Sequence, residues 1–136
     1  MAKYSAYGTA LKKGGVEYAN VTNISGPGLS LDTEDVTSHD QATPWEEIVG
    51  TILRSGEVTL DLIYDPANAT HKYAAGGLLY DLVQRTAIAL TLVFSDTAAT
   101  TWTFNALVTG FEPTAPVEGA LTASVTLKLT GAPTLV

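Results

Sequence analysis

The chain has 136 residues, of which 46% are hydrophobic and 15% are charged. That length is typical of one domain, and the composition is unlike that of disordered chains. The absence of cysteine excludes disulfide bonds, thiolate zinc sites and a cysteine nucleophile. The net charge of −7 disfavours a free-standing nucleic-acid-binding protein, which needs a basic surface. No apolar stretch reaches the roughly 20 residues of a membrane helix, so we expect no membrane insertion.

Residues 1–15 show no periodic pattern, and we interpret them as an N-terminal arm. Tyr4 and Tyr7 lie in this arm. Aromatic side chains on an arm contribute little unless they are buried, often against a neighbouring subunit. Packing on the arm's own domain remains the alternative. Lys12 and Lys13 form the one local basic spot, which is too small for a nucleic-acid surface.

A weak strand is predicted over residues 16–24, with a slip in its alternation near Ala19 and Asn20, where a bulge could re-aim the side chains. A long polar stretch follows over residues 32–43. Loops of that length in small domains are usually functional or mobile. Its acidic side chains could hold a hard cation, but the spacing of a calcium loop fails because its sixth position is Thr37. The alternative is a polar loop that faces water or another protein.

Two short helices are predicted. In the first, Thr43 is the N-cap, Pro44 takes the first helical position, Glu46 completes a capping box and Gly50 ends the helix. In the second, over residues 78–83, leucine and valine recur at helical spacing.

Four later segments alternate between apolar and polar residues with the period of a strand. They cover residues 58–64, 87–94, 101–109 and 121–130. The second is apolar on both faces, which indicates a central or covered strand. The predicted fold is therefore mainly β, a sandwich or barrel with one packed helix. The Thr- and Ser-rich strand faces would either contact bulk water or line a wet channel.

Candidate catalytic residues are sparse. The only two histidines, His39 and His71, lie far apart in the sequence. Ser38, His39 and Asp40 are the residue types of a hydrolase triad, but adjacent residues cannot easily form that relay. We therefore predict that the chain is not an enzyme and has no cofactor or metal site.

An ordered set of segments resembles the major tail tube proteins of long, non-contractile-tailed bacteriophages. The segments cover residues 8–11, 21–28, 35–40, 56–66, 108–113 and 121–131. Each segment alone is a weak signal, but their order and spacing span nearly the full chain. One departure is that Asp96 is followed by Thr97, where similar proteins often carry Asp-Gly, so a tight two-residue turn is not expected there.

The resemblance implies a single tail tube domain over residues 1–136, a β-sandwich with a flanking helix, a long loop and an arm. Six copies would form a ring, and stacked rings would form a hollow tube for DNA delivery. The implied partners are further copies and the tape-measure, tail-tip and tail-terminator proteins, with DNA only passing through. The implied location is the virion tail, after synthesis and assembly in the host cytoplasm.

By analogy, the loop over residues 32–43 would contact the next ring, and the arm would supply a second contact. The expected loop contacts are Asp32, Glu34, Asp35, His39, Asp40 and Trp45. The expected arm contacts are Tyr4, Tyr7, Leu11, Lys12 and Lys13. Deletion of residues 1–15 is then predicted to leave a folded monomer that no longer polymerises.

The acidic charge suits such a tube. Six copies would carry six times −7, or −42, formal charges, and acidic groups on the inner wall would repel DNA phosphates. We hypothesise that Glu57, Thr59 and Asp61 face this lumen. The alternative function is a monomeric β-sandwich binding or decoration module, which would need neither the acidic loop nor the arm.

Overall fold

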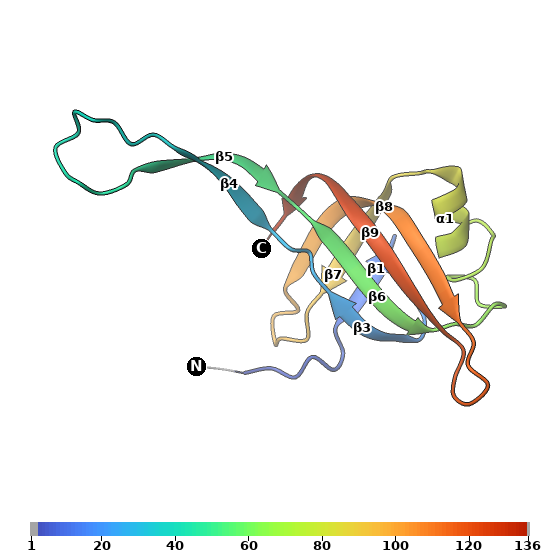
Figure 1. The fold of residues 1–136 in the computed structure, drawn as a ribbon. Coiled ribbons are helices and arrows are strands. Elements are labelled where there is room, and N and C mark those ends of the chain that lie inside the picture. The colour runs from blue at the N-terminus through green and yellow to red at the C-terminus, as the bar shows by residue number, and fades with distance from the viewer. Residues whose placement is uncertain (1–2, 136) are drawn as a thin grey trace.

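A computed structural model describes residues 3–135 of the chain. The fold is built on a seven-stranded antiparallel sheet with the order β2-β1-β7-β8-β9-β6-β3 (Figure 1). Strands β4 and β5 form a separate two-stranded hairpin. The strands are β1 (Ala10–Lys13), β2 (Val16–Glu17), β3 (Val21–Ser25), β4 (Ser30–Asp35), β5 (Ile48–Arg54), β6 (Glu57–Ile63), β7 (Ile88–Val93), β8 (Thr101–Thr114) and β9 (Thr122–Thr134), and the helix α1 spans Leu78–Gln84.

One face of the curled sheet forms the hydrophobic core. Buried and exposed residues alternate along β6, β7, β8 and β9, as the period-two pattern predicts. Leu11 of β1, Leu60 of β6 and Leu90 of β7 belong to one buried cluster, so the two halves of the sheet face each other across the core. In Figure 1, β1 and β7 lie behind β6 accordingly. Leu78 of α1 joins the same cluster.

The elements with the strongest periodicity are confirmed. Helix α1 begins at Leu78, as the leucine spacing predicts. Strand β7 pairs with β1 on one side and β8 on the other, which confirms the predicted central position, although Ala89 on the face opposite the core is exposed. Strands β8 and β9 extend beyond the predicted ranges and pair along almost their whole length.

The helix predicted from Thr43 is wrong. Residues 42–45 form bends, residues 46–47 are irregular, and Ile48 begins strand β5. Gly50, the predicted helix end, pairs with Thr33 of β4 instead. The capping signals are local, and the β-branched residues of β5, paired with β4, override them. For the same reason the long loop is shorter than predicted, because Asp32 to Asp35 belong to β4.

The boundary of the predicted arm is also wrong. Residues Ala10–Lys13 form strand β1, which pairs with β7, and Leu11 is 1% exposed. The strand is too short for its alternation to be detected in the sequence. The predicted strand over residues 16–24 is divided into β2 and β3, and Asn20 adopts a positive φ of 58° between them. Met1 and Ala2 of the predicted arm lie outside the described residues.

No helix within residues 3–135 is both long and apolar enough to cross a membrane.

Candidate self-assembly surfaces

The β4–β5 hairpin projects away from the body of the molecule (Figure 1). Every residue of β5 is exposed, so the hairpin has no core of its own. The Arg54 guanidinium lies 2.7 Å from the Asp32 carboxylate across the two strands. This hydrogen-bonded ion pair holds the pKa of Asp32 below its usual value. The exposed apolar side chains of the hairpin strands are Leu31, Ile48, Val49, Ile52 and Leu53. An exposed apolar group of this kind is typical of an interaction surface.

The tip of the hairpin is ordered by its own hydrogen bonds. The Glu47 amide donates to the Thr37 hydroxyl at 2.9 Å, and the Ser38 hydroxyl donates to Asp40 Oδ1 at 2.8 Å. Trp45 is 76% exposed at this tip. The ordered tip thus presents a large aromatic side chain to the exterior.

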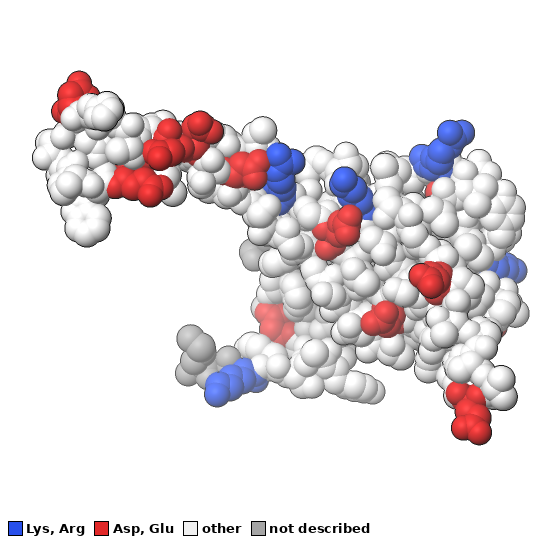
Figure 2. Space-filling model, viewed as in Figure 1, with Lys and Arg blue, Asp and Glu red and all other residues white. Residues whose placement is uncertain are grey.

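Most of the chain's net charge lies on the hairpin. Residues 30–54 hold six acidic residues and one arginine, a net charge of −5 that leaves −2 for the rest of the chain. Figure 2 shows these acidic side chains along the hairpin, whereas acidic and basic side chains are both scattered over the visible face of the body. Of the expected loop contacts, Glu34, Asp35, His39 and Asp40 are exposed and Asp32 is half-buried beside Arg54.

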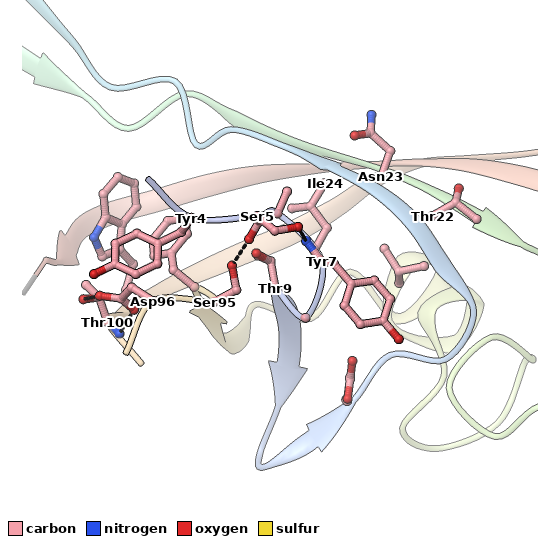
Figure 3. Close-up of a pocket in the computed structure, with 16 residues that line it drawn as sticks. Tyr4, Ser5, Tyr7, Thr9, Thr22, Asn23, Ile24, Ser95, Asp96 and Thr100 are labelled. Carbon is pink, nitrogen blue, oxygen red and sulfur yellow. Dashed lines mark hydrogen bonds between the residues drawn. The ribbon is translucent and has the colours of Figure 1, made fainter. Parts of the chain in front are cut away.

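The segment before β1 lies on its own domain but leaves its aromatic rings uncovered (Figure 3). The Ser95 hydroxyl donates to the Ser5 carbonyl, and the Tyr7 amide donates to the Ser5 hydroxyl. Tyr4 is nevertheless 57% exposed and Tyr7 92% exposed. Both tyrosines line an open cavity of about 980 Å³, together with Trp102 from β8.

The remaining expected arm contacts do not join this exposed surface. Leu11 is buried in the core, and Lys13 lies 2.8 Å from the buried Asp81 carboxylate. Lys12 is half-buried beside Thr91 in the sheet. Among the expected arm contacts, only Tyr4 and Tyr7 are therefore exposed.

A third surface is the sheet face opposite the core. Glu57 and Asp61 are exposed and Thr59 is half-buried on this face of β6. Their register partners on β9 are Lys128, Thr126 and Ser124. The structure thus brings the three lumen candidates together on one polar face. Lys128 lies opposite Glu57, a neighbour that is not evident from the sequence, although the alternation of β9 places Lys128 on its polar side.

His71 has a structural environment. Its side chain is 0% exposed, its Nδ1 accepts a hydrogen bond from the Asp65 amide at 3.2 Å, and its Nε2 lies 2.7 Å from the Ala19 carbonyl. Because Nδ1 accepts, Nε2 carries the proton and donates. His71 therefore joins the β6–α1 connection to the turn before β3. Among residues 3–135, no three acidic or histidine side chains are grouped in a way that could hold a metal ion.

No protein-family model matches the chain, and no curated protein matches its sequence. Solved structures do match its fold. A chain in the virion of a native gene transfer agent has a TM-score of 0.75 and 13% identity, covering 98% of this chain and 99% of that one. A chain in the sheath/tube terminator of PVC, an extracellular contractile injection system, has a TM-score of 0.75 and 15% identity, covering 100% and 98%.

The tail tube of SPP1 also matches, with a TM-score of 0.59 and 13% identity over 90% of this chain and 72% of the SPP1 chain. Likeness at this level of identity shows a shared fold. The chain therefore has the fold of tail tube proteins, which confirms the predicted mainly β class with one short helix.

Proposed function

We propose that the chain is a structural subunit of a tail tube, in which six copies form a ring and rings stack into a hollow conduit for DNA. The observation that carries this proposal is the fold match along almost the full length of two chains from tail or injection assemblies. The exposed hairpin, with its ordered tip and uncovered apolar side chains, supports it because a monomer gains nothing from such a surface.

Two surfaces would join the rings in this proposal. The hairpin, including Trp45, would contact the next ring. Tyr4 and Tyr7 would make the second contact, since their own domain leaves them uncovered. The partners at the ends of the tube would be tail-tip and tail-terminator proteins, and a tape-measure protein would fill it before DNA enters.

The polar face of β6 and β9 would line the lumen. Its threonines and serines offer uncharged hydroxyls, and Glu57 and Asp61 outnumber Lys128, which leaves a negative charge that repels phosphates. In a charge-reversed variant, Glu57→Lys with Asp61→Lys, the tube should retain DNA in filled particles. Its affinity for DNA should fall with rising salt concentration, a dependence that the native protein lacks. Labelling of both positions on the outside of intact tubes would contradict this orientation.

The role is structural rather than enzymatic. The two histidines are separated, since His71 is buried in backbone hydrogen bonds and His39 is at the exposed hairpin tip. The Ser38 hydroxyl donates directly to Asp40. We also propose a non-contractile tail, on the segment resemblance and the match to the SPP1 tube. Because the fold also matches a chain of a contractile injection system, the two kinds of tail must be distinguished by experiment. Tubes that assemble without a sheath protein around them would support the non-contractile tail.

Electron microscopy of the purified protein at low and high concentration tests the proposal. Rings or hollow tubes of uniform width are the expected result. A variant with Trp45→Asp and Leu53→Asp should remain monomeric while keeping its thermal unfolding profile, because both side chains are exposed in the monomer. A native protein that stays monomeric at every concentration would instead favour the binding or decoration module.

A further inference from the structure

Two apolar features lie at opposite ends of strand β9. At its C-terminal end, a groove of about 510 Å³ opens between the base of the hairpin and the end of the strand. Leu53, one of its lining residues, is 80% exposed. Arg54 is the one charged residue among those that line it. The apolar lining comes from Leu29, Leu31, Leu53, Ala132, Pro133 and Leu135. The groove is thus an open apolar surface with a guanidinium beside it.

The other end of β9 carries an apolar side chain without cover. In the turn between β8 and β9, Val117 is fully exposed, with a relative exposure of 105%. Pro116 and Glu118 on either side are exposed as well. Figure 1 shows this turn as a loop that extends beyond the sheet, at the end of β9 away from the hairpin. Val117 is therefore a small apolar projection with a carboxylate next to it.

Both features are fixed to the same strand. The Leu129 amide donates to the Gly56 carbonyl at 3.1 Å and joins β9 to the base of the hairpin. The Tyr64 amide donates to the Leu121 carbonyl at 2.9 Å and joins the start of β9 to the end of β6. The 13 residues of β9 span about 40 Å at the usual rise of a strand. The projection and the groove of one molecule therefore cannot meet each other.

We propose that the β8–β9 turn of one copy docks in the groove of a second copy, displaced along the direction of β9. Val117 enters the apolar groove, and Glu118 faces Arg54. Charge complementarity selects this occupant. Arg54 uses Nε and Nη2 for Asp32, and a guanidinium has further N–H donors for an incoming carboxylate.

Such a contact joins two different surfaces, so each added copy presents a new groove, and because the copies are displaced along β9 the contact propagates along that direction rather than closing into a ring. The inference rests on the proposed tube function and adds to it. It names the surface that receives the neighbouring ring and the turn that enters it.

Cysteine cross-linking tests the contact directly, since the natural chain has no cysteine. The variant Val117→Cys with Leu53→Cys, oxidised after assembly, should give a ladder of covalent multimers on a non-reducing gel. The matched control is Val83→Cys with Leu53→Cys, because Val83 is 55% exposed on α1 and has no place in the contact. The control should give dimers at most.

Charge exchange provides a second, independent readout. Glu118→Arg and Arg54→Glu should each raise the protein concentration at which tubes first form, by about tenfold, and the double variant should restore it. Loss of the Asp32 pair cannot explain a recovery in the double variant. Thermal unfolding shows that each variant is folded.

The outcomes separate the inference from the proposed function. Native tubes whose cysteine pair cross-links no better than the control overturn the docking alone. A native protein that never forms multimers overturns both. A ladder specific to the pair, with recovery in the charge exchange, supports both.

Discussion

The Lys13 ammonium lies 2.8 Å from Asp81 Oδ2, so an ion pair joins strand β1 to helix α1. The Asp81 side chain is 5% exposed and that of Lys13 is 28% exposed. A carboxylate this far from water needs a partner, because burial of an unpaired charge is costly. Strand β1 is therefore held both by its ladder with β7 and by a charge contact on the core side of the sheet.

Replacement of Lys13 by methionine should lower the free energy of unfolding by about 3 kcal/mol, since it leaves Asp81 without its cation. Chemical denaturation measures this loss. Lys12→Met is the matched control, because Lys12 pairs with Thr91 on the other face of the sheet and should cost far less. Equal losses in the two variants would contradict a structural role for the ion pair.

For Tyr18 we expect the opposite effect on stability, because loss of its hydroxyl should not destabilise the fold. Its side chain is 2% exposed, and within the described chain its hydroxyl has no hydrogen-bond partner. Burial raises the pKa of Tyr18, and the charge of Asp81 adds to the rise. Because an unsatisfied buried hydroxyl costs free energy, Tyr18→Phe should leave stability unchanged or raise it by up to about 1 kcal/mol. A clear loss on denaturation would show that the hydroxyl does have a partner, such as an ordered water.

The strands with a self-contained pattern could be predicted from the sequence. In β9, alternate residues are buried as far as Leu129, and the apolar residues at these positions, Ala123, Val125, Leu127 and Leu129, are visible in the sequence. Strand β1 could not be predicted in that way. Its four residues are too few for a period, and Leu11 is buried only because β7 lies beside it.

The exposed surfaces depend even more on tertiary structure. Leu53 is an ordinary strand residue in the sequence, and its exposure follows from a hairpin that projects beyond the sheet. Strand β5 was not predicted because the capping signals at Thr43 and Glu46 indicate a helix there, and the pairing with β4 overrides these signals. The acidic character of the hairpin, in contrast, is evident from the sequence because charge needs no fold to be counted.

The position of β1 changes the expected result of shortening the N-terminus. Deletion of residues 1–15 removes Leu11 and Lys13, so it should leave an unfolded or strongly destabilised chain. Deletion of residues 1–8 removes Tyr4 and Tyr7 and spares β1, so the product should fold normally but should assemble poorly. Circular dichroism and electron microscopy on the two products check the pair of outcomes. Normal tubes from the shorter deletion would exclude an assembly role for both tyrosines.

The base of the hairpin should tolerate only glycine at position 56. Gly56 has a φ of +67°, and a Cβ added there would overlap the Gly28 carbonyl. Gly131 has a similar φ of +75° but nothing within 4 Å of such a Cβ. Gly131→Ala should therefore cost about 1 kcal/mol through backbone strain alone. Gly56→Ala should cost clearly more and should displace the hairpin, as thermal unfolding and tube formation would show.

Asp96 should make the stability of the β7–β8 turn depend on pH. The Thr100 hydroxyl donates to Oδ2 at 2.6 Å and the Thr100 amide to Oδ1 at 2.7 Å. These bonds, the hydroxyl first, hold the pKa of Asp96 below its ordinary value. A carboxyl whose pKa is depressed by folding stabilises the fold above its unfolded pKa of about 3.9, and the contribution is lost as the pH falls through the folded pKa.

Asp96→Asn removes that titration and keeps the shape of the side chain. The variant should melt at a lower temperature than the native protein at pH 6, and the difference should shrink as the pH falls below about 4. Thr100→Val is the matched control, since it removes the hydroxyl that donates to Asp96. In a Thr100→Val background, the pH-dependent effect of Asp96→Asn on the melting temperature should be smaller. A difference that stays constant from pH 6 to pH 2.5 would mean that the charge of Asp96 contributes nothing, and that the turn is held by its backbone conformation alone.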